Sequence, residues 1–193
     1  DPDYDWAITN RGVTYILRRE YESALLDFNH AIELDSKNDW AIFGRGTTYL
    51  LSIKYEQALT DFNTAIRIEA DATYYYYCKA LAHLGLKQIE EFKFALKESI
   101  CQFQKEYQAH PNNHQNIFSL ALSYLTAQKA EKAKQFYQES LSKEATITDI
   151  KEAIHDLKLL LVVFPNYPQV REMEGFLQSA LSLRQSNLHM SRT

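Results

Sequence analysis

The chain has 193 residues, of which 46% are hydrophobic and 24% are charged, and this balance indicates a folded protein rather than a disordered one. Its net charge of −4 argues against binding to nucleic acid or to an anionic membrane surface, because both call for a basic face. The two cysteines, Cys78 and Cys101, lie far apart without CxxC spacing, so we expect a reduced, cytoplasmic setting rather than a disulfide framework.

Two copies of one repeating unit open the chain. Residues 5–38 and 39–72 are identical at eighteen of 34 positions. In the first copy Ile8, Gly12 and Tyr15 fall at i, i+4 and i+7, which is one face of a helix. A period of 34 is typical of a helix–turn–helix repeat. A lone helical pair cannot bury both of its apolar stripes, so we expect neighbouring repeats to stack.

The following units are recognisable but altered. In the third unit, 73–113, Pro111 comes seven residues later than the period requires, so we predict a second helix lengthened by two turns, roughly 88–109. The fourth unit occupies 114–147. A divergent pair over 148–183, with Thr148 as N-cap, is expected to close the array before a polar tail, 184–193.

These residues resemble the tetratricopeptide-repeat (TPR) family, whose pattern is a large residue, a small one four on, Tyr after three more, then Ala, an aromatic residue and Ala. The resemblance is strongest in the first two units and weakest in the last pair. It implies an all-α fold, a right-handed α–α superhelix of about ten helices in five antiparallel pairs, forming a single solenoid over 1–193. Pro2 occupies the position that Ser36 holds one repeat later, so we expect a segment of a longer bacterial TPR protein.

The resemblance also implies a concave groove that is lined by the first helix of each repeat and that holds partner peptides or helices. Trp6, Trp40 and Tyr74 recur at the period of the repeat and are expected to form an aromatic ladder there. Aromatic rings are typical of interface hot spots. The alternative is that these rings pack inside the array or, for Trp6 above all, against the repeat expected to precede it. By analogy, the predicted groove residues are Trp6, Asn10, Val13, Trp40, Phe43, Thr47, Tyr74, Tyr77, Leu81 and Phe118.

One TPR subclass binds the C-terminal carboxylate of chaperone tails with Lys, Arg and Asn side chains. The matching positions here hold Thr9, Val13, Gly44, Tyr74 and Cys78, and none is a cation. A chaperone tail is therefore excluded as the expected partner.

Two charged series follow the same period. Arg11, Arg45 and Lys79 recur once in each of the first three units, and Asp27 recurs as Asp61. The cations could meet an acidic ligand, but we favour Arg–Asp pairing between stacked repeats.

The run Tyr74–Tyr77 cannot share one helix face, and Tyr76 takes the core position of the repeat. Packing and groove lining are favoured over a nucleic-acid stacking platform, which needs basic companions.

No motif predicts catalysis, a metal or a cofactor. His110 and His114 are four apart, but Pro111 interrupts the helix between them and no third ligand is evident. Cys78 is better explained as a small packing residue than as a reactive thiol. No Gly-rich phosphate loop and no hydrolase motif occurs, so we expect no enzyme activity.

The sequence therefore predicts a cytoplasmic protein-interaction module that binds a peptide or helix with apolar anchors. Its partner could be another domain of the same polypeptide, with the array as the sensor or regulatory part of a larger signalling protein. The alternative is a structural scaffold that self-associates.

Overall fold

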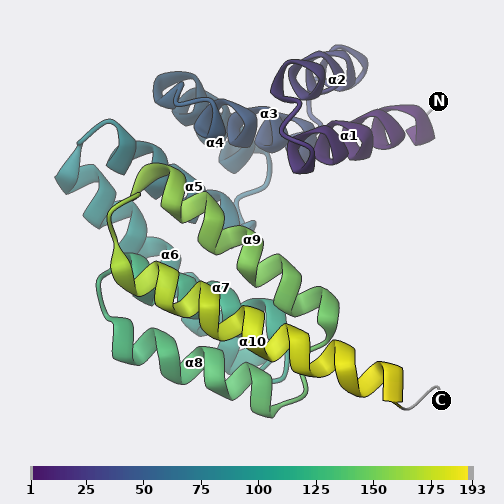
Figure 1. The fold of residues 1–193 in the computed structure, drawn as a ribbon. Coiled ribbons are helices and arrows are strands. Elements are labelled where there is room, and N and C mark those ends of the chain that lie inside the picture. Colours follow the sequence, from purple (N-terminus) through teal and green to yellow (C-terminus); the bar gives the residue numbers. More distant parts are fainter. Residues whose placement is uncertain (1, 191–193) are drawn as a thin grey trace. The chain divides into compact units, whose positions relative to one another are not determined.

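The structure, a computed structural model, describes residues 2–190, with side chains described over 4–187. Residues 2–190 form ten helices and no strand (Figure 1), which confirms the predicted all-α helical-repeat fold. In chain order the helices are α1 (Pro2–Leu17), α2 (Tyr21–Leu34), α3 (Asp39–Leu51), α4 (Tyr55–Ile68), α5 (Thr73–Gly85), α6 (Ile89–Ala109), α7 (His114–Thr126), α8 (Ala130–Ser142), α9 (Ile147–Val163) and α10 (Pro168–Met190). None of the described helices is long and apolar enough to cross a bilayer.

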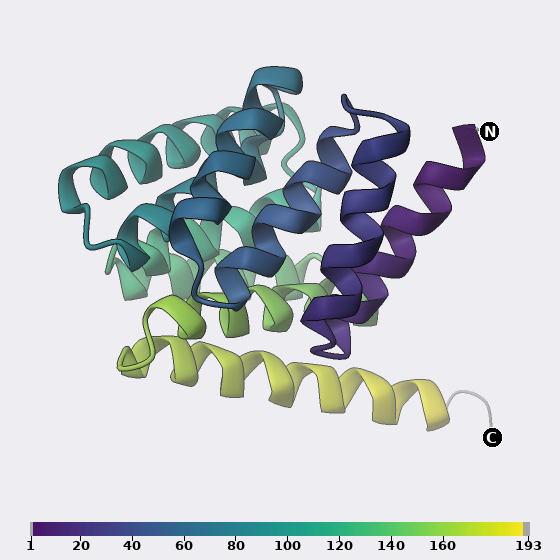
Figure 2. The same ribbon diagram turned by 90° about the horizontal axis from the view of Figure 1, so that it is seen from above.

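The chain divides into two compact units, residues 1–95 and 96–193, and the boundary falls inside α6. The single solenoid over 1–193 stays a prediction. In the first unit α1 pairs with α2 and α3 with α4, while α2 also packs on α3 and α4 on α5. Figure 2 shows α1 to α4 as neighbouring helices.

Glycines bring the helices of the first unit close together. The ring of Phe28 from α2 lies against both Gly12 of α1 and Gly44 of α3. A Cβ at Gly44 would stand 2.4 Å from the Cε1 atom of that ring, closer than any real contact. The small residues of the repeat thus mark the points where the second helix of one repeat meets the first helix on each side of it.

The turns within the helical pairs retain the repeat. Arg19, Ile53 and Lys87 adopt left-handed backbone conformations at intervals of 34, and Gln128 adopts the same conformation after a longer interval. The added length lies in α6, which has 21 residues where α2 and α4 have 14. This is the two-turn extension that the late proline suggests. Ile53 is the most strained of these four residues, because a β-branched side chain disfavours a backbone φ of 61°.

The beginning of α9 differs from the sequence expectation. Thr146, not Thr148, is the N-cap: its hydroxyl accepts a hydrogen bond from the Asp149 amide, and the Asp149 carboxylate accepts one from the Thr146 amide. This reciprocal capping box satisfies two otherwise unpaired donors, and Thr148 has no equivalent partner three residues on. Thr148 therefore lies in the first turn of the helix.

The last helix is longer than expected. α10 continues through Met190 instead of ending near Leu183, because the segment after Leu183 contains neither Gly nor Pro to stop it. Arg184 anchors this extension by donating to the Leu141 carbonyl at 2.9 Å. Of the predicted tail, residues 191–193 lie outside the described part of the chain.

The second unit encloses one of its helices. α7 packs against α8 and also against α9, while α10 packs against α9 and α8. Every residue of α7 from Ile117 to Thr126 is buried. The first helix of the fourth repeat is consequently a core helix of this unit.

Candidate functional site

Two tryptophans stand on the first helices of the first unit with their rings in solvent. Trp6 of α1 is 67% exposed, and Trp40 of α3, one repeat later, is 45% exposed. On α1 Trp6 is followed by Asn10 and Val13 at i+4 and i+7, so the three share a face. α1 and α3 therefore each expose a tryptophan at the same position of the repeat.

The Trp40 ring rests on a cluster of buried aromatic rings. It stacks on Phe43 at a centroid distance of 5.5 Å, and Phe43 stacks on Tyr75 at 4.4 Å. Phe43 also contacts Phe62 at 5.6 Å and the edge of Tyr74 at 5.9 Å. Phe43 is itself buried, so this predicted groove residue supports Trp40 from below. A ring held in this way loses little conformational entropy on binding a partner.

The ladder of Trp6, Trp40 and Tyr74 is built only in part. Trp40 and Tyr74 are linked through Phe43, which stacks on Trp40 and meets Tyr74 in a T-shaped contact. For Trp6 the described contacts include no ring neighbour, and the hydrogen bond at this point joins the Asn10 side-chain amide to the Trp6 carbonyl at 2.9 Å.

The remaining predicted groove residues differ in exposure. Val13 and Thr47 are half-buried, while Tyr77, Leu81 and Phe118 are buried. The structure thus brings Trp6 and Trp40 to the surface and places the later members of the set in cores.

The tyrosine run packs differently from the prediction. Tyr75 and Tyr77 are the buried pair, and Tyr76 is only half-buried, so the assignment of Tyr76 to the core position was wrong. Tyr75 is held in the core by its stack on Phe43 and by donating to the Asp39 carboxylate at 2.7 Å. Burial, reinforced by this hydrogen bond, raises the pKa of Tyr75 well above its usual value. Ala41 holds the same register on α3 and is also buried, because α2 packs on α3 as α4 packs on α5.

A stripe of predicted groove positions runs from Trp6 through Asn10 and Val13 to Leu17 on α1, and from Trp40 through Thr47 to Leu51 on α3. This stripe, called the inner stripe below, carries no charge. Between the tryptophan at one end and Leu17 or Leu51 at the other stand short or polar residues, among them Val13 and Thr47. Leu17 is exposed and Leu51 half-buried. A charged side chain brought to this stripe would lose hydration without meeting an opposite charge.

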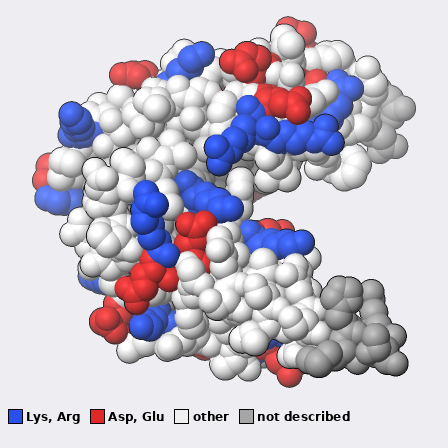
Figure 3. All heavy atoms as spheres, in the orientation of Figure 1, with Lys and Arg blue, Asp and Glu red and all other residues white. Residues whose placement is uncertain are grey.

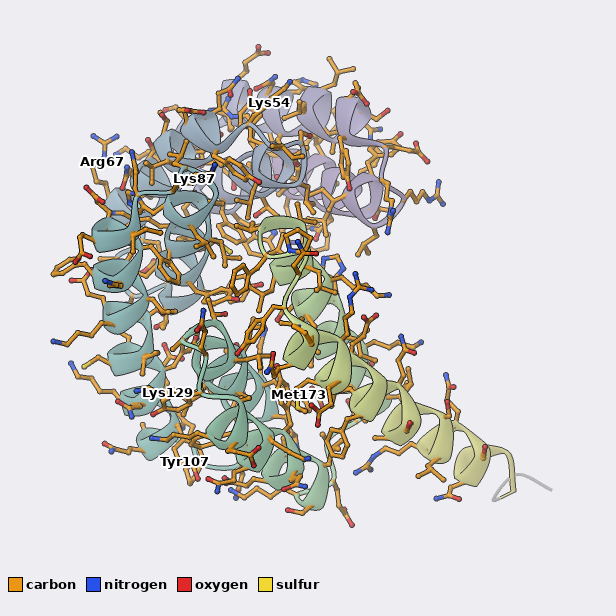
Figure 4. The ribbon with its side chains drawn as sticks, turned by 60° about the vertical axis from the view of Figure 1, so that its left-hand side comes forward. Lys54, Arg67, Lys87, Tyr107, Lys129 and Met173 are labelled. Atoms are coloured by element: carbon orange, nitrogen blue, oxygen red, sulfur yellow. The ribbon has the colours of Figure 1, made fainter. Side chains whose placement is uncertain are left out.

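Three exposed lysines stand at the ends of helices. Lys54 and Lys87 in the first unit, and Lys129 in the second, stand in or beside the turns that join the two helices of their pairs, and all three are exposed (Figure 4). Figure 3 shows basic and acidic side chains interspersed with wide uncharged areas on the visible face. A phosphate backbone, by contrast, requires a continuous basic stripe.

The periodic Arg–Asp pairs are present, but within each helical pair. Arg11 donates from Nε and Nη2 to both oxygens of Asp27 at 2.7 Å, and Arg45 binds Asp61 in the same way at 2.8 Å. These hydrogen bonds raise the pKa of both arginines. The expected pairing between stacked repeats was wrong in location, since the contact across repeats goes from Arg45 Nη1 to the side-chain oxygen of Asn29 at 2.8 Å. Asn29 recurs as Asn63 one repeat later, and this recurrence is the sequence signal for a contact across repeats.

A polar cluster in the second unit was not foreseen. Glu139 of α8 accepts from Tyr107 of α6 at 2.7 Å and from Lys143 at 2.6 Å, and Lys143 also donates to the Pro111 carbonyl. Burial alone would raise the pKa of Glu139, but the two hydrogen bonds outweigh it and lower that pKa. The cluster ties the end of the lengthened α6 to α8, which is a structural role.

The described residues contain no group of three or more His, Cys, Asp or Glu side chains placed to hold a metal ion. His114 has its Nδ1 atom 3.0 Å from the Ser140 hydroxyl, and His110 lies in the turn before α7. Cys78 is buried and Cys101 is exposed.

The sequence matches no known family model and no curated protein. Its structure is similar to that of TTC0263, a thermophilic TPR protein of Thermus thermophilus, with a TM-score of 0.59 and 18% identity over 92% of this chain and 98% of that one. It is also similar to PilF of Pseudomonas aeruginosa, with a TM-score of 0.57 and 17% identity over 99% of this chain and 86% of that one. At these identities the likeness concerns the fold. Together with the repeat period of the sequence and the stacked helical pairs, it shows that the chain has the tetratricopeptide-repeat fold.

Proposed function

We propose that the chain is a protein-interaction module that binds an apolar segment of a partner protein on the inner stripe of α1 and α3. The observation that carries this proposal is the exposure of Trp6 and Trp40 at the same register of successive repeats. Tryptophan is the residue most enriched in interface hot spots, and two exposed indole rings that recur at one register favour a binding site.

Covering the two rings supplies part of the free energy that specific binding needs. If an indole side chain offers about 200 Å², the exposed fractions correspond to roughly 130 Å² for Trp6 and roughly 90 Å² for Trp40. At about 25 cal/mol per Å², covering them contributes about 3 and about 2 kcal/mol before the costs of association. The buried stack beneath Trp40 keeps its ordering cost small.

The chain supplies its own reporter for this contact. Trp6 and Trp40 are its two tryptophans, so intrinsic tryptophan fluorescence comes entirely from the proposed site. We expect a red-shifted emission in the free protein and a blue shift with reduced acrylamide quenching when a partner covers the stripe. Affinity capture from the native cell provides the partner, and titration of the purified partner then follows the shift.

The decisive variant is Trp6→Ala combined with Trp40→Ala, which should abolish capture while leaving helical content and cooperative melting intact. Its matched control is Leu26→Ala with Phe94→Ala. These side chains are 71% and 65% exposed on second helices, again at one register. The control should capture the partner as the parent chain does.

Loss of folding in the tryptophan variant would show that the rings are core, and loss of capture in both variants would show general stickiness. Either result ends the proposal. If the only captured species is the chain itself, the alternative of a self-associating scaffold takes its place.

We also propose that this contact serves regulation, with the repeats as the sensor part of a larger signalling protein and the partner either a separate protein or another domain. The uncharged stripe suits a switchable contact that needs no fixed ion pair. A nucleotide-binding or protease domain encoded in the same gene would support this role, and a gene that encodes no domain beyond the repeats would refute it.

A further inference from the structure

Trp40 is exposed on a helix that has neighbours on both sides. α2 packs on α3, α4 pairs with it, and α1 and α5 also contact it. The indole ring of Trp40 is nevertheless 45% exposed, whereas Phe43, on which it stacks, is 5% exposed. The exposure of Trp40 is therefore a property of the stacked repeats and does not depend on where the chain begins.

The inner stripe on α3 offers a hydrogen-bond donor without an exposed acceptor. An indole ring carries one N–H donor and no acceptor. Among the described contacts, neither Trp6 nor Trp40 donates its Nε1–H to another residue. The side-chain oxygen of Thr47, the polar residue farther along this stripe, is buried. On α1 the amide of Asn10 donates to the Trp6 carbonyl, which leaves its oxygen as an acceptor beside Trp6 but not beside Trp40.

This imbalance distinguishes the forms that a partner segment can take. Covering an indole N–H without supplying an acceptor costs that donor its hydration. An α-helix uses its main-chain carbonyls internally, so its apolar face brings no acceptor to the ring. A β-strand brings carbonyls but also N–H groups, and these find no side-chain acceptor on the α3 stripe. The main chain that accepts without donating is that of consecutive prolines, because proline has no N–H.

The geometry of a polyproline II helix also matches the repeat. Its main chain makes no internal hydrogen bonds, so its carbonyls are free, and it has three residues per turn. At a rise of about 3.1 Å per residue, residues three apart point the same way and lie about 9 Å from each other. Helices in contact, as α1 and α3 are, have axes about 8–10 Å apart. Prolines three apart therefore meet the same register of successive repeats, the register of Trp6 and Trp40.

We propose that the inner stripe binds a proline-rich segment of a partner protein in the polyproline II conformation. One prolyl ring lies on the face of Trp40 turned away from Phe43, a prolyl carbonyl accepts from Trp40 Nε1–H, and a proline three residues away lies on Trp6. This assignment rests on the proposed function, since it names the class of segment that the stripe binds. A preformed polyproline helix loses little entropy on docking, and it brings no charge to an uncharged stripe.

The probe is decaproline with fluorescein at its N-terminus, because this peptide adopts the required conformation by itself. Fluorescence anisotropy with the full chain should show saturable binding. Two labelled decapeptides serve for comparison: a Gly-Ser repeat, which is flexible and carries an N–H at every residue, and a hydrocarbon-stapled amphipathic helix rich in leucine. Neither should show binding that depends on Trp40.

Two substitutions at Trp40 test the contact. Trp40→Ala removes both the ring and the donor and should weaken decaproline binding about tenfold or more. Trp40→Phe keeps an aromatic ring without the N–H and should weaken binding about fivefold, the loss of one hydrogen bond. The Leu26→Ala, Phe94→Ala chain, altered at exposed positions of second helices, should bind as the parent does.

Absence of saturable decaproline binding, or equal affinity for the Trp40→Ala chain, overturns the proposal. A helical peptide that binds through Trp40 as tightly as decaproline overturns it as well. The native partner separates this proposal from the proposed function. A partner that is captured through Trp6 and Trp40 but contains no proline-rich segment ends the polyproline assignment alone, whereas capture that survives the double tryptophan variant ends both.

Discussion

The first helices α1 and α3 differ in environment from α7, the first helix of the fourth repeat. In the first unit α1 and α3 leave Trp6 and Trp40 exposed at the end of a half-buried, uncharged stripe, while α5, the last first helix of that unit, is already largely buried. In the second unit α7 occupies the same place in its repeat, yet every residue from Ile117 to Thr126 is buried. The same register therefore produces a candidate binding surface on α1 and α3 and a core on α7.

The difference in burial between these first helices comes from the helices that follow each of them in the sequence. In the first unit α3 packs on α2, so each new repeat adds to the stack and leaves the inner stripe of α1 open. In the second unit α9 packs against α7, and α10 covers α9 and contacts α8. A divergent last pair thus converts the inner face of α7 into interior. The exposure of a repeat position therefore depends on the helices around it, and three measurements test this dependence.

The largest expected effect is the contrast between Phe118→Ala and Trp6→Ala. Phe118 is 4% exposed and packs against the ring of Tyr137, so its truncation should lower the free energy of unfolding by about 3–5 kcal/mol. Trp6→Ala removes a ring from solvent and should change it by no more than about 0.5 kcal/mol. Urea unfolding followed by circular dichroism measures both. Equal losses would mean that the two inner faces are alike.

An intermediate effect separates two glycines, one in each unit. Gly44→Ala places a Cβ 2.4 Å from the Phe28 ring and should cost about 1–3 kcal/mol, since α2 and α3 must move apart. Gly175→Ala in α10 meets no atom within 4 Å and should stabilise the protein by about 0.5–1 kcal/mol through helix propensity. Thermal melting of both variants gives the sign of each change. A neutral Gly44→Ala would show that the helices of the first unit are not closely packed.

The smallest effect is a pH dependence that belongs to the second unit. Burial, and to a lesser extent Lys158, lowers the pKa of His155 in α9. Below about pH 6.5, His155 therefore binds a proton in the unfolded chain but not in the folded chain. The free energy of unfolding should fall as the pH drops from about 7 toward the pKa of His155 in the folded state.

Urea midpoints between about pH 7.5 and 5.5 measure this loss. His155→Asn should remove that part of the decline, and His110→Asn, at an exposed turn, is the control for losing a histidine. An unchanged slope in His155→Asn would show that α9 does not shield this side chain.

Much of the fold follows from the printed sequence. The period of the repeat determines helical pairs, because small residues such as Gly12 and Gly46 recur where helices must touch. The late position of Pro111 indicates the long α6 for a related reason, as two added turns restore the helix face. The Arg11 and Asp27 series indicates ion pairing, although the pairs form within a helical hairpin rather than between repeats.

The candidate site was only half determined by the sequence. Periodicity states which side chains share a helix face, and on that basis it singled out Trp6 and Trp40, which are exposed, together with Tyr77 and Phe118, which are buried. It does not state which neighbouring helix will cover that face. Which helix covers that face is set by contacts between elements distant in sequence, such as α9 on α7. These contacts depend on the segments that resemble the repeat least. The tertiary structure decided exposure because burial is a property of pairs of surfaces, whereas helix periodicity belongs to one chain segment.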